Sequence, residues 1–129
     1  MVMGLSMYGF PFSTDGDVRS SPAVADLEND GSFEIIFGSN DGTLYALNSF
    51  GMEVISFQQS GIINGSSAII DLDQDGDREI IFVSYDGTNT DGEVHAIHHD
   101  GTEVYGFPVD LDEKMMAGPA AGDLSLIHI

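Results

Sequence analysis

The chain has 129 residues, of which 22 are Asp or Glu and only 3 are Lys or Arg, so its formal net charge is −19. This balance excludes nucleic acid and anionic membrane surfaces as partners, because their phosphates are neutralised by Lys and Arg. The chain has no Cys, which excludes disulfides and thiolate metal sites. A hydrophobic content of 42% and 16 Gly residues indicate a globular, turn-rich domain.

The first segment, residues 1–14, contains the motif Gly9-Phe10-Pro11. The same three residues recur near the other end of the chain as Gly106-Phe107-Pro108. We therefore expect residues 1–14 to be the end of a preceding structural unit. Its first seven residues lack the basic region and apolar core of a signal peptide, and no apolar run in the chain approaches the roughly 20 residues that a membrane helix needs.

An internal repeat follows. Residues 21–43 read SPAVADLENDGSFEIIFGSNDGT, and residues 66–88 read SSAIIDLDQDGDREIIFVSYDGT. The match resumes after an insertion at residues 86–91, which we interpret as a lengthened hairpin tip. The sequence predicts complete repeats over residues 15–64 and 65–116. A truncated third repeat is expected over residues 117–129, where Asp123 would be its first acidic ligand and residues 125–129 depart from the pattern as a non-native tail.

Each repeat is expected to hold four short strands. The second strand carries apolar residues on both faces, which favours a sheet packed between two neighbouring sheets. Four strands in a repeat of about 45 residues are typical of a β-propeller blade. We therefore predict an all-β fold of four-stranded antiparallel propeller blades, two complete and others partial, which together form an incomplete propeller. In the first repeat the expected strands are Pro22–Asp26, Glu34–Ser39, Leu44–Asn48 and Glu53–Phe57.

Acidic residues between the first and second strands of both repeats follow the pattern D-x-[DE]-x-D-G-x-x-E. Alternate carboxylates before a Gly allow a tight loop to surround one hard cation, and oxygen ligands favour Ca²⁺. An EF-hand is excluded, because its twelfth loop position needs Glu and is Phe37 or Phe82 here. The alternative is a pair of ordinary polar turns. The predicted ligands are Asp26, Glu28, Asp30 and Glu34, then Asp71, Asp73, Asp75 and Glu79, with backbone carbonyls at Ser32 and Asp77.

Three histidines lie close together in the second repeat. His95, His98 and His99 occupy the positions of Tyr45, Asn48 and Ser49 in the first repeat, so we interpret them as strand-end and turn residues, not as a metal or catalytic cluster. The sequence also lacks a G-x-S-x-G nucleophile motif and a phosphate-binding Gly-rich loop. No catalytic residues and no organic cofactor are predicted, and the chain is not expected to be an enzyme.

The repeat, its acidic loop and the recurrent Gly-Phe-Pro resemble the FG-GAP and VCBS-type repeats of integrin-α-like propellers over nearly the whole chain. The resemblance implies a Ca²⁺ ion in each acidic loop, an extracellular or cell-surface location, and binding of protein or carbohydrate through loops on one propeller face. The chain departs from this pattern at Glu28, where the family has Asp, which predicts a looser first site. It also carries two complete blades, whereas such propellers close with about six to eight.

The leading hypothesis is a calcium-binding propeller segment of a larger secreted or surface protein, mediating adhesion or ligand binding, in which calcium is structural. Its partners would be a protein or carbohydrate ligand and neighbouring blades, or a second copy of the chain. An alternative is part of a secreted polysaccharide-acting enzyme of the lyase type, which would cleave pectin-like oligosaccharides. A third hypothesis is a spacer that binds calcium alone. The basic residues available to a lyase are Arg19, Arg78 and Lys114.

Overall fold

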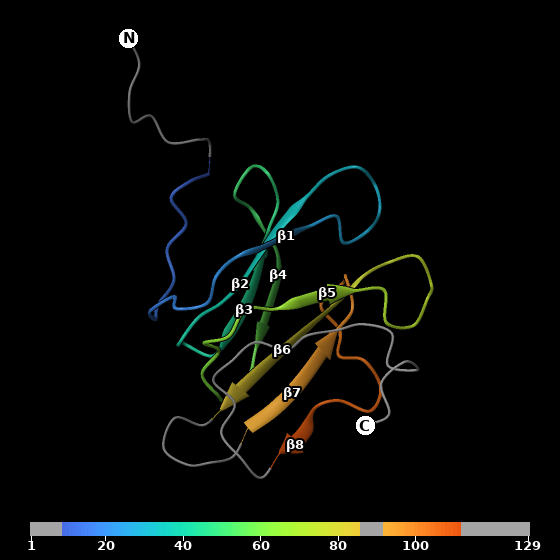
Figure 1. Cartoon of the computed structure of the whole chain (residues 1–129). Helices are drawn as coiled ribbons and strands as arrows, with labels where there is room; N and C mark the ends of the chain where they lie inside the picture. The colour runs from blue at the N-terminus through green and yellow to red at the C-terminus, as the bar shows by residue number, and fades with distance from the viewer. Residues whose placement is uncertain (1–8, 86–91, 112–129) are drawn as a thin grey trace.

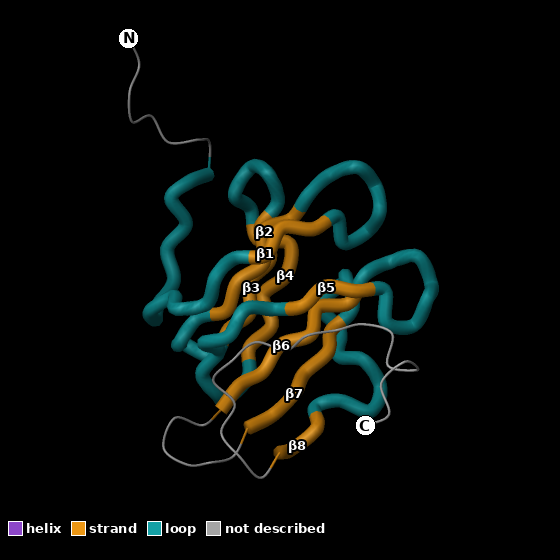
Figure 2. The backbone as a smooth tube through the Cα atoms, viewed as in Figure 1, coloured by secondary structure: helices purple, strands orange, loops and turns teal. Residues whose placement is uncertain are grey.

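The computed structural model describes residues 9–85 and 92–111, which form two four-stranded antiparallel sheets (Figures 1 and 2). In both sheets the strands lie side by side in chain order. The all-β class and the four-stranded antiparallel sheets expected from the sequence are confirmed, while their place in a propeller stays a prediction. Sheet one holds β1 (Ala23–Ala25), β2 (Glu34–Gly38), β3 (Thr43–Leu47) and β4 (Glu53–Gln58), and sheet two holds β5 (Ala68–Ile70), β6 (Glu79–Tyr85), β7 (Gly92–Ile97) and β8 (Val109–Leu111).

Some sequence-based expectations fall on other parts of the chain. Residues 1–8, the inserted tip at 86–91 and residues 112–129 lie outside the described residues. The last range includes Lys114, at the end of the second repeat, and the whole third repeat with Asp123. Among the described residues, no helix has the length and hydropathy needed to cross a membrane.

The first three strands of the two sheets share one register. Ala25 pairs with Glu34 as Ile70 pairs with Glu79. One strand further, Ile36 pairs with Ala46 as Ile81 pairs with Ala96. The sequence repeat is therefore also a structural repeat, and equivalent side chains face equivalent sides of their sheets.

The fourth strand of sheet two departs from the sequence match. Glu103 forms only an isolated bridge with Ile97, whereas its counterpart Glu53 begins β4. The chain then turns through Gly106 and the cis Phe107–Pro108 bond before β8 begins. Pro108 has no backbone N–H to donate to a ladder, so a strand from Glu103 is interrupted there. The fourth strand of sheet two therefore begins at Val109, about six residues after Glu103, the counterpart of the first residue of β4.

The hydrophobic core lies between the two sheets. Ile36, Leu44 and Ala46 on one face of sheet one belong to the same buried cluster as Ile80 and Phe82 of sheet two. The opposite face of β2 is only half-buried, so the expected burial of this strand on both faces is confirmed for one face and partial for the other.

The segment before β1 repeats a contact found between the sheets. Phe57 of sheet one meets the rings of Phe82 and His95 edge-on, with 5.9 Å between centroids in each case. Phe12 meets Phe37 and Tyr45 in the same way, at 6.2 and 5.4 Å. Residues 9–20 thus lie against sheet one as residues 57–65 lie against sheet two. The assignment of the N-terminal segment to a preceding unit stays a prediction.

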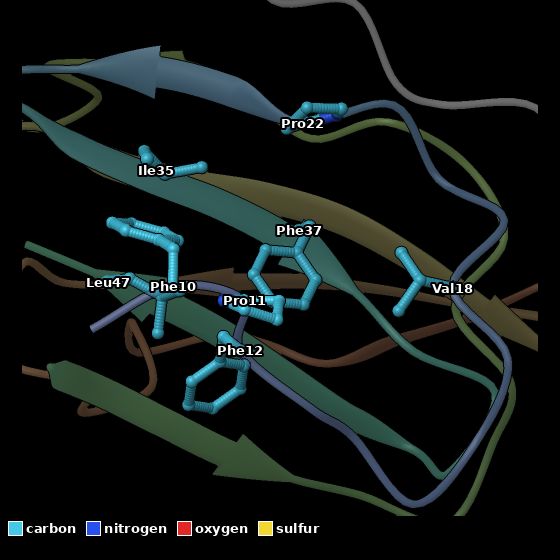
Figure 3. A pocket seen from close by; sticks show the side chains of 8 residues that line it. All are labelled: Phe10, Pro11, Phe12, Val18, Pro22, Ile35, Phe37 and Leu47. Atoms are coloured by element: carbon cyan, nitrogen blue, oxygen red, sulfur yellow. The ribbon is translucent and has the colours of Figure 1, made fainter. Parts of the chain in front are cut away.

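A cavity of about 400 Å³ lies beside this segment on the outer face of sheet one (Figure 3). Its lining is apolar, and four of its residues have counterparts 45 or 50 positions later in the chain that belong to the buried core. These pairs are Ile35 with Ile80, Phe37 with Phe82, Leu47 with Ile97 and Val18 with Ile63. The full lining is Phe10, Pro11, Phe12, Val18, Pro22, Ile35, Phe37 and Leu47.

Candidate metal centres

The acidic loops connect the first and second strands of each sheet and project on the same side in Figure 1. We name residues 26–34 loop one and residues 71–79 loop two. In loop one, the carboxylate of Asp26 accepts hydrogen bonds from the backbone N–H groups of Asp30 (3.0 Å) and Gly31 (2.8 Å). In loop two, Asp71 accepts the equivalent bonds from Asp75 (3.1 Å) and Gly76 (2.9 Å). The first acid of the pattern therefore closes each loop on itself.

The turn inside each loop requires left-handed backbone. Gly31 and Gly76 have φ of 91° and 101°, and an added Cβ would meet no atom within 4 Å at either position. Backbone conformation, not space, therefore explains these glycines. Two residues earlier, Asn29 and Gln74 also have positive φ, at 56° and 62°. Asn tolerates this region well, and Gln does so less readily.

The last acid of each pattern begins the second strand and is buried. Glu34 is 5% exposed and accepts the N–H of Leu27 at 2.9 Å. Glu79 is fully buried and accepts the N–H of Leu72 at 2.6 Å. Each carboxylate thus ties the start of its loop to the strand that follows the loop.

The electrostatics of loop one favour a bound cation. Burial raises the pKa of Glu34, and the carboxylates of Asp30, Glu28 and Asp26 raise it further, against the opposing N–H of Leu27. Although desolvation acts to raise the pKa of Asp26, the N–H groups of Gly31 and Asp30 hold it below its ordinary value. The loop therefore keeps an ionised carboxylate beside one whose ionisation is disfavoured, and a cation would favour the ionised form of both.

The two loops differ in how closely their acids gather. Asp71, Asp73 and Asp75 each offer a carboxylate oxygen within 4.8 Å of the others. Among the described residues no such group forms from Asp26, Glu28 and Asp30, and the Glu28 side chain is exposed. That Glu28 loosens the first site stays a prediction.

The two positions predicted to supply backbone carbonyls also lie in the loops. The N–H of Ser32 donates to Asp30, and the N–H of Asp77 donates to Asp75. These bonds fix the backbone conformation at both positions. The role of the Ser32 and Asp77 carbonyls as ligands stays a prediction.

Two of the histidines face loop two. His98 Nδ1 lies 3.3 Å from Glu79 Oε1, and His99 Nδ1 lies 3.6 Å from Asp77 Oδ2. Both histidines come from the turn after β7, as expected. Sequence reasoning missed their proximity to the loop, because the turn and the loop meet only when β6 and β7 pair.

His95 is a correction to the sequence interpretation. It lies inside β7, not at a strand end, and its ring stacks on Phe82 with centroids 4.8 Å apart. Its Nε2 is 3.2 Å from Ser84 Oγ, and its Nδ1 is 2.9 Å from Glu103 Oε2. This order of hydroxyl, imidazole and carboxylate is that of an activated nucleophile, a pairing that the sequence did not reveal. Ser84 is 1% exposed and His95 3% exposed, so a substrate would not reach the hydroxyl. The three groups instead join β6 and β7 to the segment after β7.

Comparison with known proteins adds no relative, since no protein-family model matches the chain and no curated protein matches it significantly. The geometry of the two loops is therefore the basis for a functional assignment.

Proposed function

We propose that the chain is a calcium-binding segment of a β-propeller of the FG-GAP or VCBS type, and that it belongs to a larger secreted or surface protein. Calcium in the acidic loops would be structural. The propeller would mediate adhesion or the binding of a protein or carbohydrate, without catalysis. The observation that carries this proposal is the duplicated acidic loop, which is closed by the same hydrogen bonds between equivalent strands of both sheets.

The donor set favours Ca²⁺ over smaller divalent ions. Asp71, Asp73 and Asp75 offer three carboxylate oxygens, all within 4.8 Å of one another. Ca²⁺ accepts six to eight oxygens at roughly 2.3–2.6 Å, so two of its ligands can stand up to about 5 Å apart. Mg²⁺ binds at about 2.0–2.1 Å and requires near-octahedral geometry, which would demand a tighter and more regular cage.

Electrostatics links calcium binding to folding. Two carboxylates 4 Å apart repel by about 1–4 kcal/mol for effective dielectric constants between 80 and 20. The chain has a net charge of −19 and places several acids in each loop. A divalent ion that binds only the folded loops removes part of this repulsion and stabilises the fold by mass action.

The strand arrangement supports the blade part of the proposal. Each sheet is a four-stranded antiparallel meander, and one face of sheet one packs against sheet two. The acidic loops lie on the same side (Figure 1). In an extracellular protein, millimolar calcium would suffice for weak sites of this kind.

A calorimetric Ca²⁺ titration of the EDTA-treated chain tests the proposal, with Mg²⁺ as the control and a thermal melt beside it. We expect saturable binding of about two Ca²⁺ per chain, in the micromolar to millimolar range, with loop two binding more tightly and the melting temperature rising. Folded chain that binds no Ca²⁺, or binds Mg²⁺ equally well, would contradict the proposal.

A further inference from the structure

A nitrogen donor stands beside the buried carboxylate of loop two. His98 Nδ1 is 3.3 Å from Oε1 of Glu79, whose side chain is fully buried. Asp73 completes the group, because one donor atom from each of Asp73, Glu79 and His98 lies within 4.8 Å of the other two. This set differs from the oxygen-only set of Asp71, Asp73 and Asp75 in its imidazole and in its buried carboxylate.

The same turn in sheet one shows that an imidazole is not required for folding there. Backbone bonds match in the two turns, with Asn48 N–H donating to Met52 O and His98 N–H donating to Thr102 O. In sheet one, the Asn48 side chain accepts the N–H groups of Phe50 (2.9 Å) and Met52 (3.0 Å). Its side chain is therefore committed to its own turn.

In sheet two this capping is done by Asp100. Its carboxylate accepts the hydroxyl of Thr102 at 2.6 Å and the N–H of Thr102 at 3.0 Å, and these two bonds lower the pKa of Asp100. His98 is thereby released from the turn, and its ring is directed to Glu79.

The distances suit an ion that accepts both nitrogen and oxygen. Two donors at about 2.0–2.1 Å from a tetrahedral zinc ion stand about 3.4 Å apart, close to the 3.3 Å between His98 Nδ1 and Glu79 Oε1. Glu79 Oε2 accepts the N–H of Leu72 at 2.6 Å. That bond orients the carboxylate so that Oε1 faces the imidazole, as hydrogen bonds to metal-binding carboxylates commonly do.

We propose that Asp73, Glu79 and His98 form a second type of metal site, which binds a borderline divalent ion of the Zn²⁺ class. Imidazole with two carboxylates suits zinc and its first-row neighbours, whereas calcium prefers oxygen alone. The site extends the proposed calcium function, because Asp73 belongs to both donor sets, but it depends on His98, which the calcium site does not need.

Calorimetric Zn²⁺ titration of the calcium-free full chain tests the site. The variant is His98→Asn, which places at position 98 the residue type that sheet one has at the equivalent position, Asn48. We expect one Zn²⁺ per wild-type chain and affinity about tenfold or more weaker in His98→Asn, since even an outer-shell partner of a metal ligand is worth tenfold or more. His99→Asn is the matched control and should leave Zn²⁺ binding unchanged. Equal Zn²⁺ affinity in wild type and His98→Asn, or an equal loss in His99→Asn, would overturn the assignment.

Asp75→Asn separates this site from the calcium proposal, because Asp75 belongs only to the oxygen set. It should weaken Ca²⁺ binding to loop two and leave Zn²⁺ binding unchanged, while His98→Asn should do the reverse. Absence of Ca²⁺ binding with His98-dependent Zn²⁺ binding would reject the calcium function alone. Should His98→Asn fail to fold, NMR of the wild-type imidazoles decides the question: Zn²⁺ must shift the ring signals of His98, and bound Zn²⁺ without such a shift would overturn the proposal.

Discussion

The guanidinium of Arg78 donates a hydrogen bond from Nη1 to the backbone carbonyl oxygen of Asp26, at 2.6 Å. The backbone N–H of Arg78 also donates to the carbonyl of Leu27, at 2.8 Å. Arg78 lies in loop two, and both acceptors lie in loop one. The two acidic loops are therefore joined directly, and the position of one depends on the other. This contact also engages one of the few basic residues that a polysaccharide lyase would need.

Arg78→Met tests the connection between the loops. Loss of a charge-assisted hydrogen bond to a partly buried carbonyl should lower the free energy of unfolding by about 1.5–3 kcal/mol. It should also weaken Ca²⁺ binding at loop one, because Asp26 loses its support. Arg19→Met is the control, since among residues 9–85 and 92–111 Arg19 pairs with Asp17 alone, at 3.6 Å and exposed to solvent. Its replacement should change stability by no more than about 0.5 kcal/mol. Equal denaturant midpoints for the two variants would contradict this role of Arg78.

Glu34 predicts the pH dependence of the calcium-free chain. Its pKa is raised above the ordinary value of 4.5, with burial as the first cause. The folded state therefore binds this proton more tightly than the unfolded state does. The contribution of protonated Glu34 to the free energy of unfolding is complete below about pH 4.5. It is lost as the pH rises through the pKa that Glu34 has in the folded chain.

Glu34→Gln should remove this part of the pH dependence, because the amide oxygen can still accept the N–H of Leu27 and carries no charge. Denaturant melts in EDTA between pH 4.5 and 7 measure the effect. The wild-type chain should lose stability relative to Glu34→Gln as the pH rises. Parallel stability curves for the two proteins would show that Glu34 does not titrate differently in the folded chain.

The strand positions of sheet one could be predicted closely from the sequence, and the reasons are local. Short continuous apolar runs mark β2 and β3, and Asn40-Asp41-Gly42 marks the hairpin between them. The start of β8 could not be found in this way. The match between Gly51 and Gly101 continues through Val104, and only the geometry shows that pairing resumes at Val109 after the turn at Gly106.

In the candidate sites, too, the contacts within one loop could be predicted from the sequence, and the contacts made by strand pairing could not. Spacing within one loop predicts that Asp71, Asp73 and Asp75 gather, because their separation is short and the Gly turn is local. The approach of His98 to Glu79, and of Ser84 and Glu103 to His95, depends on strand pairing across several residues. A usable signal existed, since His95 and His98 are positions where the second repeat differs chemically from the first. Positions where two otherwise matching repeats carry different chemical groups indicate contacts that only one of the repeats makes.

The turn inside loop two predicts opposite effects for two substitutions. Gly76 has φ of 101°, where an L-residue is strained, so Gly76→Ala should destabilise the chain by about 1–2 kcal/mol. Gln74 has φ of 62°, and loop one has Asn29 at the equivalent position with φ of 56°. Gln74→Asn should therefore stabilise the chain by up to about 1 kcal/mol. Thermal melts in EDTA compare the three proteins, and a loss of stability in Gln74→Asn would contradict the account of this turn.

The cavity on sheet one predicts association between copies of the chain. Its residues Ile35, Phe37, Leu47 and Val18 correspond to Ile80, Phe82, Ile97 and Ile63, all of which are buried between the two sheets. In sheet two, the equivalent face is covered by Ile36, Leu44 and Ala46 of sheet one. Among the described residues, residues 9–20 cover the corresponding apolar face of sheet one only in part, and Ile35 and Phe37 stay half-buried. A sheet from a second copy is the occupant that the internal contact predicts.

Val18→Lys tests this association with little risk to folding, because Val18 is 47% exposed and lies at the edge of the cavity. Light scattering after size exclusion, over a range of concentrations in Ca²⁺, should show the wild-type chain associating and Val18→Lys remaining monomeric at the same concentrations. Tyr105→Lys is the control, since Tyr105 is fully exposed and does not line the cavity. It should associate as the wild type does, because the added charge lies away from the cavity. Monomeric wild type at every concentration, or equal loss of association in both variants, would show that the cavity is not the contact surface.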